Sequence, residues 1–459
     1  MEREPNWYER YDATHIIKVR LRLVDVPGTF GRALEAIGAL GAKIGDISFV
    51  GVDGPHKLRD VQLFFVDEAH EKECIEALAI DGVEVVSVED EVMEMHRGGT
   101  IETRSRVRLD TLMDLRMAYT PGVARVCERI AKDPEAAKEF TTVQNKIAIV
   151  TNGTAVLGLG DIGALAGLPV MEGKAAILSR FVNVWAEPIL VDAKDPATIV
   201  ETVANIASGY GAIQLEDIAA PACFEVEREL QRRVDKPVFH DDQHGTATVC
   251  VAGLLGALKK TKREIESVKA VVLGAGAAGA AIARFLVQLG VEDVVLCDST
   301  GALYDGRTER MNEEKERLAK ETNAKGVRGS LEEVIAGRDL FIGVSKPKLV
   351  TKEMVRSMAK DPIVFALANP VSEISVHDAL DAGAAVALDG RGMNNALAYP
   401  GLFRGALDAR AKRITPRMMK AAAEALAARA DDSLLPDMLD DGVHRAVANA
   451  VQDAWDRGD

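Results

Sequence analysis

The chain has 459 residues, of which 47% are hydrophobic and 28% charged, and a formal net charge of −15. This is the composition of a folded globular protein of about three domains, and its excess of acid argues against nucleic acid or an anionic membrane as the main partner. No apolar run approaches the roughly 18 residues needed to span a bilayer, the charged segment 1–12 lacks the core of a signal peptide, and the five cysteines are scattered, so we expect a cytoplasmic protein with reduced thiols.

Residues 1–95 show strand and helix patterns in the order βαββαβ. Apolar residues from Ile17 to Leu23 alternate with charged ones, as in a strand with one face in water. Thr29 stands where it can cap a helix that ends near Gly41. The other expected elements are strands over 44–52 and 61–66 with a connector over 51–60, a helix over 71–78 and a strand over 83–88.

This order, with a D-x-P-G loop after the first strand, resembles the ACT domain, a small-molecule sensor found on metabolic enzymes. The resemblance implies an effector site near Asp25, Pro27 and Gly28, for an amino acid or a central metabolite. The alternative is a dimerisation module without a ligand, because a fold does not settle a function. Residues 96–110 are expected to form a linker.

Three features follow between residues 111 and 183. Tyr119 precedes a Pro-Gly turn, which suits a phenol that projects from a loop into a cleft, although most loop tyrosines are structural. Residues 158–163 fit GxGxxG, but Pro169 interrupts the expected helix and Asn183 stands where a ribose-binding acid is needed, which favours a substrate-side turn. Lys174 precedes an apolar run, where partial desolvation would lower its pKa and make it a base. A solvated surface lysine is the alternative.

Acidic residues then occur in two pairs. Glu216 and Asp217 can face one ion only if their strand ends there, and the following Ala-Ala-Pro is consistent with such an end. Together with Asp241 or Asp242 they would form an oxygen set suited to Mg²⁺ or Mn²⁺, whereas no Cys/His cluster has the ligand spacing of a zinc site. Two histidines flank the second pair, and we interpret them as packing or orienting residues rather than ligands. They are His240 and His244.

Residues 268–298 form a complete βαβ pattern with a dinucleotide-binding turn. The turn consists of Gly274, Ala275, Gly276, Ala277, Ala278 and Gly279. The first glycine permits the turn, the second lets the backbone approach a pyrophosphate, and the third lets the helix pack on the strand. The pyrophosphate would lie at the helix N-terminus. Asp298 ends the second strand, about 20 residues past the glycines, where it can accept ribose hydroxyls.

The rest of the chain continues the alternation. We expect a loop over 299–307 and a solvated charged helix over 313–320. Buried strands are expected over 339–344 and 362–370, with Asn369 at the carboxyl end of the second, where open α/β sheets bind ligands. Residues from 400 onward are expected to return as helices to the first half of the chain.

Eight motifs in this order resemble the malic enzyme family in its compact bacterial form, over about residues 105 to 440. They are AYTPGVA, LGLGDIG, MEGKAA, LEDIAAP, FHDDQHGTA, LGAGAAG, ANP and MNNALAYPG. The resemblance implies an α/β fold with a substrate and metal domain over 111–245, a Rossmann-type NAD(P)-binding domain over 246–394 and a helical segment over 395–459. It also implies oxidative decarboxylation of L-malate to pyruvate and CO₂, with a divalent metal and reduction of NAD or NADP.

The same resemblance implies roles for single residues. Lys174 would take the proton of the C2 hydroxyl and Tyr119 would protonate C3, while Asp241 would neighbour the lysine. The implied metal ligands are Glu216, Asp217 and Asp242. The residues implied to contact substrate or nicotinamide are Asn369, Asn394 and Asn395.

Two positions depart from the pattern of the larger relatives. Ala155 and Val156 stand where those enzymes carry a substrate-binding arginine, and Arg125 or Arg180 are the candidates to replace it. Thr300 stands where some NADP-using relatives have lysine. Because Asp298 would also repel a 2′-phosphate, we expect NAD to be preferred over NADP.

Two other functions fit parts of the sequence. One is an ACT-regulated amino-acid dehydrogenase, which would need no metal, and the other is a catalytically silent effector-binding regulator. If the chain has the function that its resemblance to the malic enzyme family implies, we expect a homodimer or a larger homo-oligomer.

Overall fold

We describe the chain from a computed structural model that covers residues 15–430 and 433–458. The charged segment 1–12, discussed above as lacking a signal-peptide core, lies outside these residues. The chain divides into two compact units, Met1–Glu102 and Thr103–Asp459, and each is described by itself. Among the described helices, none is both long enough and apolar enough to cross a membrane.

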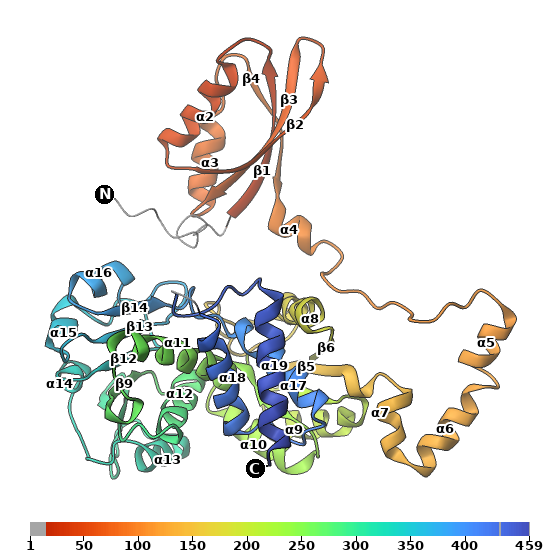
Figure 1. Ribbon diagram of the computed structural model, residues 1–459. Coiled ribbons are helices and arrows are strands. Elements are labelled where there is room, and N and C mark those ends of the chain that lie inside the picture. The colour runs from red at the N-terminus through yellow and green to blue at the C-terminus, as the bar shows by residue number, and fades with distance from the viewer. Residues whose placement is uncertain (1–14, 431–432, 459) are drawn as a thin grey trace. The chain divides into compact units, whose positions relative to one another are not determined.

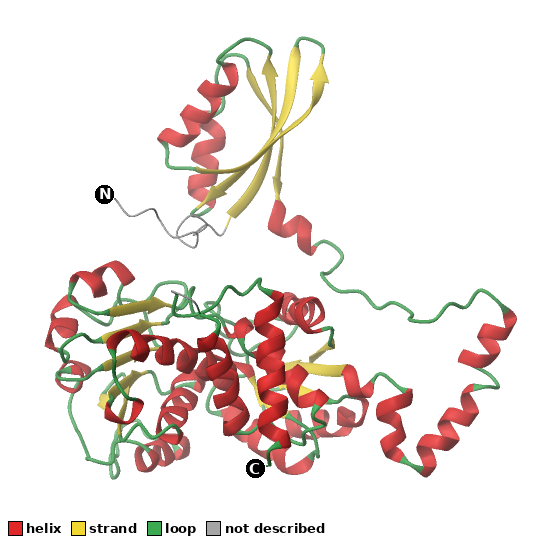
Figure 2. Ribbon diagram, viewed as in Figure 1, coloured by secondary structure: helices red, strands yellow, loops and turns green. Residues whose placement is uncertain are grey.

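The first unit is a four-stranded antiparallel sheet with two helices on one face, in the predicted βαββαβ order (Figures 1 and 2). Its strand order is β2-β3-β1-β4. Alternate residues of β1 from Ile17 to Leu23 are buried against the helices, as the sequence alternation predicted. The elements are β1 His15–Val24, α2 Thr29–Ala39, β2 Lys43–Asp53, β3 His56–Phe65, α3 Glu68–Ala77, β4 Val83–Asp90 and α4 Glu91–His96.

Two predictions for this unit are wrong. The connector expected over 51–60 is mostly strand, because β2 and β3 run through it as a hairpin and only Gly54 and Pro55 separate them. Thr29 does not cap α2, because it is the first helical residue and its side chain is buried. Gly28 takes the cap position with a φ of 92°, a backbone conformation that glycine adopts at little cost.

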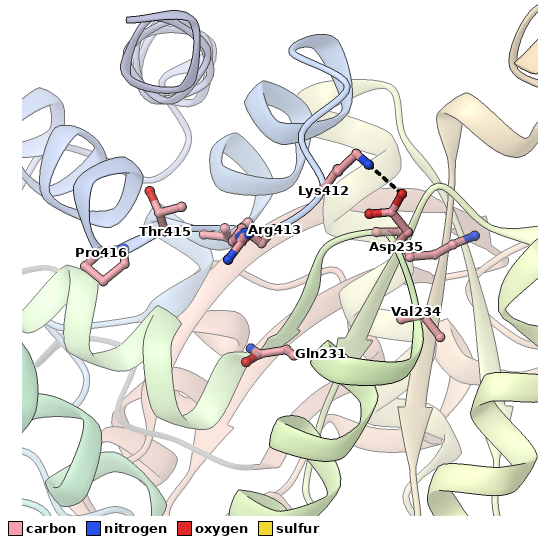
Figure 3. Close-up of a pocket in the computed structure, with 9 residues that line it drawn as sticks. Gln231, Val234, Asp235, Lys412, Arg413, Thr415 and Pro416 are labelled. Carbon is pink, nitrogen blue, oxygen red and sulfur yellow. Dashed lines mark hydrogen bonds and ion pairs between the residues drawn. The ribbon is translucent and has the colours of Figure 1, made fainter. Parts of the chain in front are cut away.

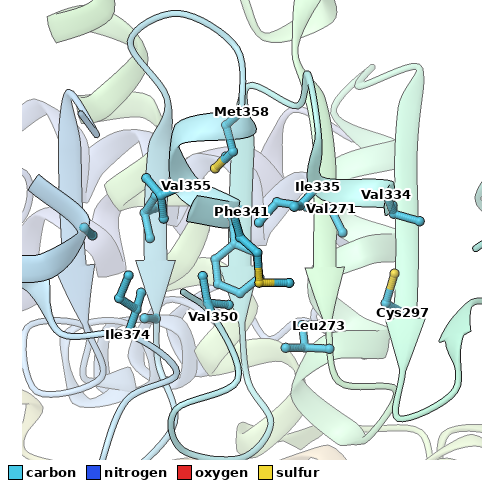
Figure 4. Close-up of a cluster of buried hydrophobic side chains, with 14 of the residues drawn as sticks. Val271, Leu273, Cys297, Val334, Ile335, Phe341, Val350, Val355, Met358 and Ile374 are labelled. Atoms are coloured by element: carbon cyan, nitrogen blue, oxygen red, sulfur yellow. The ribbon is translucent and has the colours of Figure 1, made fainter. Parts of the chain in front are cut away.

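The larger sheet of the second unit has the order β11-β10-β9-β12-β13-β14 and is parallel except for β11. The strand order reverses between β9 and β12, which is where open α/β sheets bind ligands at the carboxyl ends. Side chains such as Val271, Phe341 and Val355 fill the core on one of its faces (Figure 4). The elements are β9 Lys269–Leu273, α12 Ala277–Gln288, β10 Asp293–Asp298, β11 Gly301–Ala302, α13 Glu313–Glu321, α14 Leu331–Ile335, β12 Leu340–Gly343, α15 Lys352–Ser357, β13 Ile363–Ala366, α16 Val376–Asp381 and β14 Val386–Asp389.

The smaller sheet is fully parallel, with the order β6-β5-β7-β8. Its elements are β5 Lys146–Thr151, α8 Leu168–Val182, β6 Trp185–Leu190, α9 Pro196–Ile206, β7 Ala212–Leu215, α10 Ala222–Arg233 and β8 Val238–His240. α11 Thr246–Thr261 then leads to the larger sheet. Pro169 does not interrupt a helix, as we had expected, but stands in the first turn of α8, where its missing N–H is no loss.

The C-terminal helices return to the smaller sheet, as predicted. They are α17 Tyr399–Asp408, α18 Pro416–Ala428 and α19 Asp441–Asp456. Both α17 and α19 pack on α8, and Gln144 donates a hydrogen bond to the carbonyl of Leu407. The chain thus crosses twice between the sheets, once through α11 and once on its way to α17.

Two helical regions differ in how they are packed. α5 Leu112–Ala118 and α6 Val123–Lys132 bury none of their residues, and α7 Ala137–Phe140 follows them. By contrast, α13 is not a purely solvated helix, because Glu314 is buried and its Oε1 lies 2.6 Å from Nη1 of Arg284.

Candidate active site

Four acidic residues follow the ends of two neighbouring strands. β7 is followed by Glu216 and Asp217, and β8 by Asp241 and Asp242. Because β7 and β8 are parallel neighbours, their carboxyl ends meet at one edge of the sheet. One carboxylate oxygen each from Glu216, Asp217 and Asp242 lies within 4.8 Å of the others. The structure therefore brings together the three acids that the family resemblance implied as metal ligands.

A turn at Asp217 lets two consecutive acids face the same place. Asp217 has a φ of 53°, a left-handed conformation that is uncommon for residues other than glycine. Side chains of consecutive residues point to opposite faces only while the strand continues, and β7 has ended by Glu216. The backbone N–H of Asp217 also donates to Oδ2 of Asp242 at 2.9 Å, which ties the two chain segments together.

The acid cluster fits a hard divalent cation. Burial, followed by the charges of Asp242 and Glu216, raises the pKa of Asp217 to about 8. Oδ2 of Asp217 is buried and has no hydrogen-bond partner among the described residues. A dication would relieve both the burial penalty and the repulsion, and a set of carboxylate oxygens suits Mg²⁺ or Mn²⁺.

Lys174 reaches this cluster from the helix α8. Its Nζ lies 2.5 Å from Oδ2 of Asp241 and 2.9 Å from Oε1 of Glu216, and it donates to Oδ1 of Asn395 at 3.4 Å. The aromatic ring of Tyr399 lies 4.8 Å from the same nitrogen. The lysine side chain is only 12% exposed, so it is not the solvated surface lysine of the alternative interpretation.

The expected direction of the Lys174 pKa shift is wrong for this arrangement. Burial alone would lower the pKa of Lys174, as the sequence suggested, but the charges of Asp241 and Glu216 outweigh burial and raise it above its ordinary value. Burial raises the pKa of Asp241 to about 6, even though Lys174 acts in the opposite direction. The proton on Lys174 is therefore controlled by the carboxylates that face it.

The two flanking histidines lie beside the acid cluster and share Glu227 as a partner. Nε2 of His244 lies 2.9 Å from Oε2 of Glu227, and Oε1 of Glu227 accepts from the backbone N–H of His240. His240 is fully buried, and its ring nitrogens have no hydrogen-bond partner among the described residues, but its Nδ1 lies 3.8 Å from Oδ2 of Asp242. Glu227 was missed by the sequence analysis, because it lies in the polar run of α10 and no motif distinguishes it. Tyr399 was also missed, although it lies within the quoted motif MNNALAYPG.

Other predicted site residues lie outside this contact network. Tyr119 follows α5 and is 67% exposed, and none of the described contacts of Lys174 or of the acids involve it. Arg180 pairs with Asp441 at 2.8 Å on the surface, and Arg125 is exposed, so neither contacts the acids. Asn394 accepts a hydrogen bond from the backbone of Ala396 and acts as a helix cap.

The glycine turn after β9 has the geometry that the sequence predicted. Gly274 has a φ of 118°, and a Cβ there would lie 2.6 Å from the carbonyl oxygen of Val344. A Cβ at Gly279 would lie 1.7 Å from the carbonyl oxygen of Gly274, so the third glycine is needed for packing. At Gly276 a Cβ would meet nothing within 4 Å. The open space beside Gly276 is where a pyrophosphate is expected at the start of α12.

Asn369 and Asp298 follow strands of this sheet. Asn369 lies three residues past the end of β13, next to Gly390, where a Cβ would lie 2.6 Å from its Nδ2. Asp298 is the last residue of β10, and Lys315, Thr300 and Arg307 bind its carboxylate. Against the effect of burial, their hydrogen bonds lower the pKa of Asp298 to about 2.

A separate pocket of about 510 Å³ lies between the end of α10 and the start of α18 (Figure 3). It shares no residue with the acid cluster. Lys412 pairs with Asp235 at 2.7 Å, and Lys236 donates to the carbonyls of Ala207 and Tyr210, so most of its charged groups are already bound.

Comparisons with known proteins match both halves of the second unit. Residues 99–198 match the family model described as malic enzyme, N-terminal domain, and residues 243–440 the one described as malic enzyme, NAD binding domain. An NAD-dependent malic enzyme of Geobacillus stearothermophilus is 44% identical over 95% of this chain and 94% of its own length. A bifunctional malic/malolactic enzyme of Bacillus subtilis is 48% identical over 80% of this chain and 93% of its own length.

Solved structures agree with these matches. The crystal structure of an NAD-dependent malic enzyme from Thermotoga maritima has a TM-score of 0.77 and 41% identity, covering 79% of this chain and 99% of that one. A malic enzyme from Pyrococcus horikoshii has a TM-score of 0.78 and 39% identity, covering 80% of this chain and 90% of that one.

Proposed function

Because the chain belongs to the malic enzyme family, we infer that it oxidatively decarboxylates L-malate to pyruvate and CO₂, with NAD preferred over NADP as the hydride acceptor. The observation that carries this inference is the placement of Lys174 against the acid cluster formed by Glu216, Asp217 and Asp242, in a chain whose second sheet carries a dinucleotide-binding turn. The amino-acid dehydrogenase alternative does not call for such a cluster.

We propose that Lys174 takes the proton from the C2 hydroxyl of malate. Its Nζ is buried and held by Asp241 and Glu216, which fixes its position. Asp241 is itself fully buried, and Asn395 accepts a hydrogen bond from the same nitrogen. A general base needs this kind of fixed geometry before its pKa matters.

We propose Glu216, Asp217 and Asp242 as the ligands of Mg²⁺ or Mn²⁺. Such an ion would supply Lewis-acid stabilisation of the negative charge that develops on substrate oxygens as CO₂ leaves. The acids themselves shape the site, because they exclude most water around Lys174 and give it a strongly negative surrounding.

Tyr119 is proposed as the acid that protonates C3, supplied by a second copy of the chain. Tyr119 lies on an arm, residues 103–132, that exposes a row of apolar side chains. They are Val107, Leu109, Leu112, Met113, Leu115 and Met117. A second apolar surface, on the loop beside the acid cluster, exposes Leu157, Leu159 and Leu165.

This loop lies directly beside the acids. The backbone N–H of Thr154 donates to the carbonyl of Asp217 at 3.1 Å, and Oγ1 of Thr154 accepts from Ala219 at 2.9 Å. Large apolar surfaces on a single chain usually mark an interface. If the arm of one copy covers the loop of another, both surfaces are buried and Tyr119 is brought to the partner's acids.

Mixing two inactive variants tests the shared site. Tyr119→Phe and Lys174→Ala each remove one group, and a mixed dimer would contain one site with both groups intact. Random mixing in equal amounts should then restore about a quarter of the normal rate, because half the dimers are mixed and each has one active site of two. Absence of any recovery, in a sample where mixed dimers are shown by mass spectrometry, would refute the shared site.

The activity itself is tested with malate, NAD and Mn²⁺, following NADH and pyruvate together. We expect both products in equal amounts and loss of turnover when a chelator is added. Turnover that persists with the chelator would refute the metal assignment and favour the amino-acid dehydrogenase. Absence of malate-dependent NADH would favour the silent regulator.

For the first unit we propose an ACT-like effector module, with the ligand near Asp25, Pro27 and Gly28. The βαββαβ order and the left-handed Gly28 at the start of α2 support this, and Oδ1 of Asp25 pairs with Lys57 at 2.7 Å. Calorimetry of the full chain against amino acids and central metabolites should find one that binds, and Asp25→Ala should weaken it. If none binds, a dimerisation module is the better interpretation.

We place the protein in the cytoplasm, which agrees with five free cysteines, four of them buried.

A further inference from the structure

The segment that carries two of the four acids is short and has an uncommon backbone. β8 ends at His240, and Asp241–Gly245 then form a single π-helical turn before α11 begins. Such π turns are rare and often occur at functional sites. Asp241 folds back over this turn, because a Cβ at Gly245 would lie 1.8 Å from Oδ1 of Asp241. The positions of Asp241 and Asp242 therefore depend on what holds the π turn in place.

Glu227 of α10 contacts three residues of this segment. Its Oε1 accepts a hydrogen bond from the backbone N–H of His240 at 3.0 Å, and its Oε2 accepts one from Nε2 of Gln243 at 3.3 Å. The same Oε2 lies 2.9 Å from Nε2 of His244. These three partners stand on both sides of the two acids in the sequence. One carboxylate from a neighbouring helix is thus bound to the π turn before and after the acids.

The carboxylate of Glu227 is suited to hold a turn because it is buried and charged. Only 6% of Glu227 is exposed. Burial would raise the pKa of Glu227, but the charge and the hydrogen bond of His244 outweigh burial and lower it below its ordinary value. An ionised carboxylate accepts hydrogen bonds at both oxygens, which matches a turn that presents N–H donors. Hydrogen bonds are stronger in a buried site than in water, so these contacts restrict the turn.

The π turn connects Glu227 to the groups of the proposed mechanism. Oδ2 of Asp241 accepts from Nζ of Lys174 at 2.5 Å, and Oδ2 of Asp242 accepts from the backbone N–H of Asp217 at 2.9 Å. A shift of the turn would change both contacts together. The described contacts of Glu227 include neither Lys174 nor the three proposed metal ligands, so Glu227 can act on them only through the turn.

We propose that Glu227 is a positioning residue, which holds the π turn in the conformation where Asp241 faces Lys174 and Asp242 faces the proposed metal site. This inference rests on the proposed function and deepens it, because it names the residue that sets the geometry of the base and of a ligand at once. Buried partners of this kind orient ligating groups, and their loss usually costs about 10–100-fold in metal affinity or activity.

Two substitutions of similar size separate hydrogen bonding from packing. Glu227→Leu accepts no hydrogen bond, whereas Glu227→Gln keeps an acceptor for the N–H of His240 and an amide that can pair with Gln243. For Glu227→Leu we expect the Kd for Mn²⁺, measured by calorimetry without malate or NAD, to rise about tenfold or more. At saturating Mn²⁺ its kcat should fall by about 10–100-fold. Glu227→Gln should stay within about threefold of the wild type in both quantities, because its hydrogen bonds are kept.

A measurement without metal checks the turn directly. The backbone N–H of His240 loses its acceptor in Glu227→Leu, so its hydrogen exchange should be at least about tenfold faster than in the wild type. Glu227→Gln should exchange at the wild-type rate. Glu225→Leu is the matched control, because Glu225 is an exposed glutamate of the same helix α10. It should change neither Mn²⁺ affinity, nor kcat, nor hydrogen exchange.

A second variant covers the case in which Glu227→Leu does not fold, as checked by circular dichroism. His244→Phe keeps a ring beside Phe239 and removes one of the three contacts of Glu227. Its Kd for Mn²⁺ should rise at least about threefold, the effect of one lost hydrogen bond. An unchanged Kd in folded His244→Phe would then overturn the inference.

The outcomes separate this inference from the proposed function. Folded Glu227→Leu with unchanged Mn²⁺ affinity, kcat and hydrogen exchange would overturn the inference and leave the proposed function standing. Equal losses in Glu227→Leu and Glu227→Gln would also overturn it, because hydrogen bonding would then not be the cause. A protein whose Mn²⁺ affinity depends on Glu227 as expected, but which does not oxidise malate, would overturn only the proposed function.

Discussion

Lys174, the proposed general base, is held by two carboxylates in a site that leaves its side chain only 12% exposed. A lysine on a polar surface would already be protonated near neutral pH and could not accept a proton, and a lysine alone in an apolar core would be expelled or neutral. Here Asp241 and Glu216 keep Lys174 positively charged until one of these carboxylates binds another partner, such as the proposed metal ion.

The sequence could indicate that Lys174 is buried, from the apolar run that follows it. It could not indicate the direction of the pKa shift, because the partners lie 42 and 67 positions away (216 − 174 and 241 − 174).

Removal of the Lys174 amine should affect turnover far more than binding. For Lys174→Met we expect kcat to fall by about 10²–10⁴, the usual contribution of a positioned general base. Mn²⁺ binding should persist, because the three proposed ligands remain. Steady-state kinetics with malate and NAD measure the first effect, and Mn²⁺ titration measures the second. Lys138→Met, which removes a partly exposed lysine paired with Glu135, is the control and should change neither. A Lys174→Met enzyme with a normal kcat would remove the lysine from the mechanism.

Metal binding should expel a proton and therefore strengthen with pH. Asp217 has a pKa of about 8 in the metal-free protein, so below this pH it is mostly protonated, and only its ionised form binds a cation. The affinity for Mn²⁺ should rise about tenfold per pH unit between roughly pH 6 and 8 and then level off. Calorimetry in buffers of different ionisation enthalpy would count the proton directly. Asp217→Asn should flatten the slope, and a flat slope in the unchanged protein would contradict the assignment.

At the scale of elements, two glycines of the turn between β9 and α12 are expected to have different roles. Gly279 allows the turn to pack, and Gly276 leaves room for the nucleotide. Gly279→Ala would place a methyl group 1.7 Å from a carbonyl oxygen, whereas Gly276→Ala would place one in open space. We expect Gly279→Ala to lower the free energy of unfolding by about 1–3 kcal/mol or more. Gly276→Ala should keep its stability but lose at least about tenfold in NADH affinity, because its methyl group fills the space of the pyrophosphate. Thermal unfolding and NADH fluorescence distinguish the two effects. Equal stability of the two variants would show that the turn can relax.

The order of elements was more predictable than their ends. Alternation of apolar residues in β1 and the glycines after β9 are local signals, and both led to the correct elements. Thr29 was misplaced because threonine occurs both just before a helix and in its first turn. Pro169 was misplaced because proline can either end a helix or stand in its first turn. A shift of one or two positions decides between these roles. The hairpin of β2 and β3 was underestimated because only Gly54 and Pro55 separate its strands, so that most of the expected connector is paired strand. Cross-strand pairing extends strands beyond what their own residues indicate.

The acid cluster and Tyr119 mark the limits of prediction at the scale of the site. Glu216, Asp217 and Asp242 converge because β7 and β8 are neighbours in the sheet, and strand order is a property of the whole unit. The motifs that resemble the family identified the acids correctly as a group. They could not indicate that Tyr119 would stand on an arm whose apolar side chains are exposed in the described part of the chain. One sequence does not distinguish contacts within a chain from contacts between copies.

At the scale of the whole molecule, the catalytic and regulatory functions should be separable. The second unit begins at Thr103, and both family matches lie almost wholly within it, at 99–198 and 243–440. The match to the Thermotoga maritima structure covers 99% of that chain and 79% of this one. We therefore expect residues 103–459 alone to fold and to turn over malate with a kcat within about threefold of the full chain, because the first unit contributes no residue to the proposed mechanism. Any metabolite found to bind the full chain should alter the turnover rate of the full chain and leave that of the shortened protein unaffected.

If the shortened protein is folded by circular dichroism but inactive with malate, NAD and Mn²⁺, the first unit is part of the catalytic assembly. If it is active and still responds to the effector, the effector site lies in the second unit.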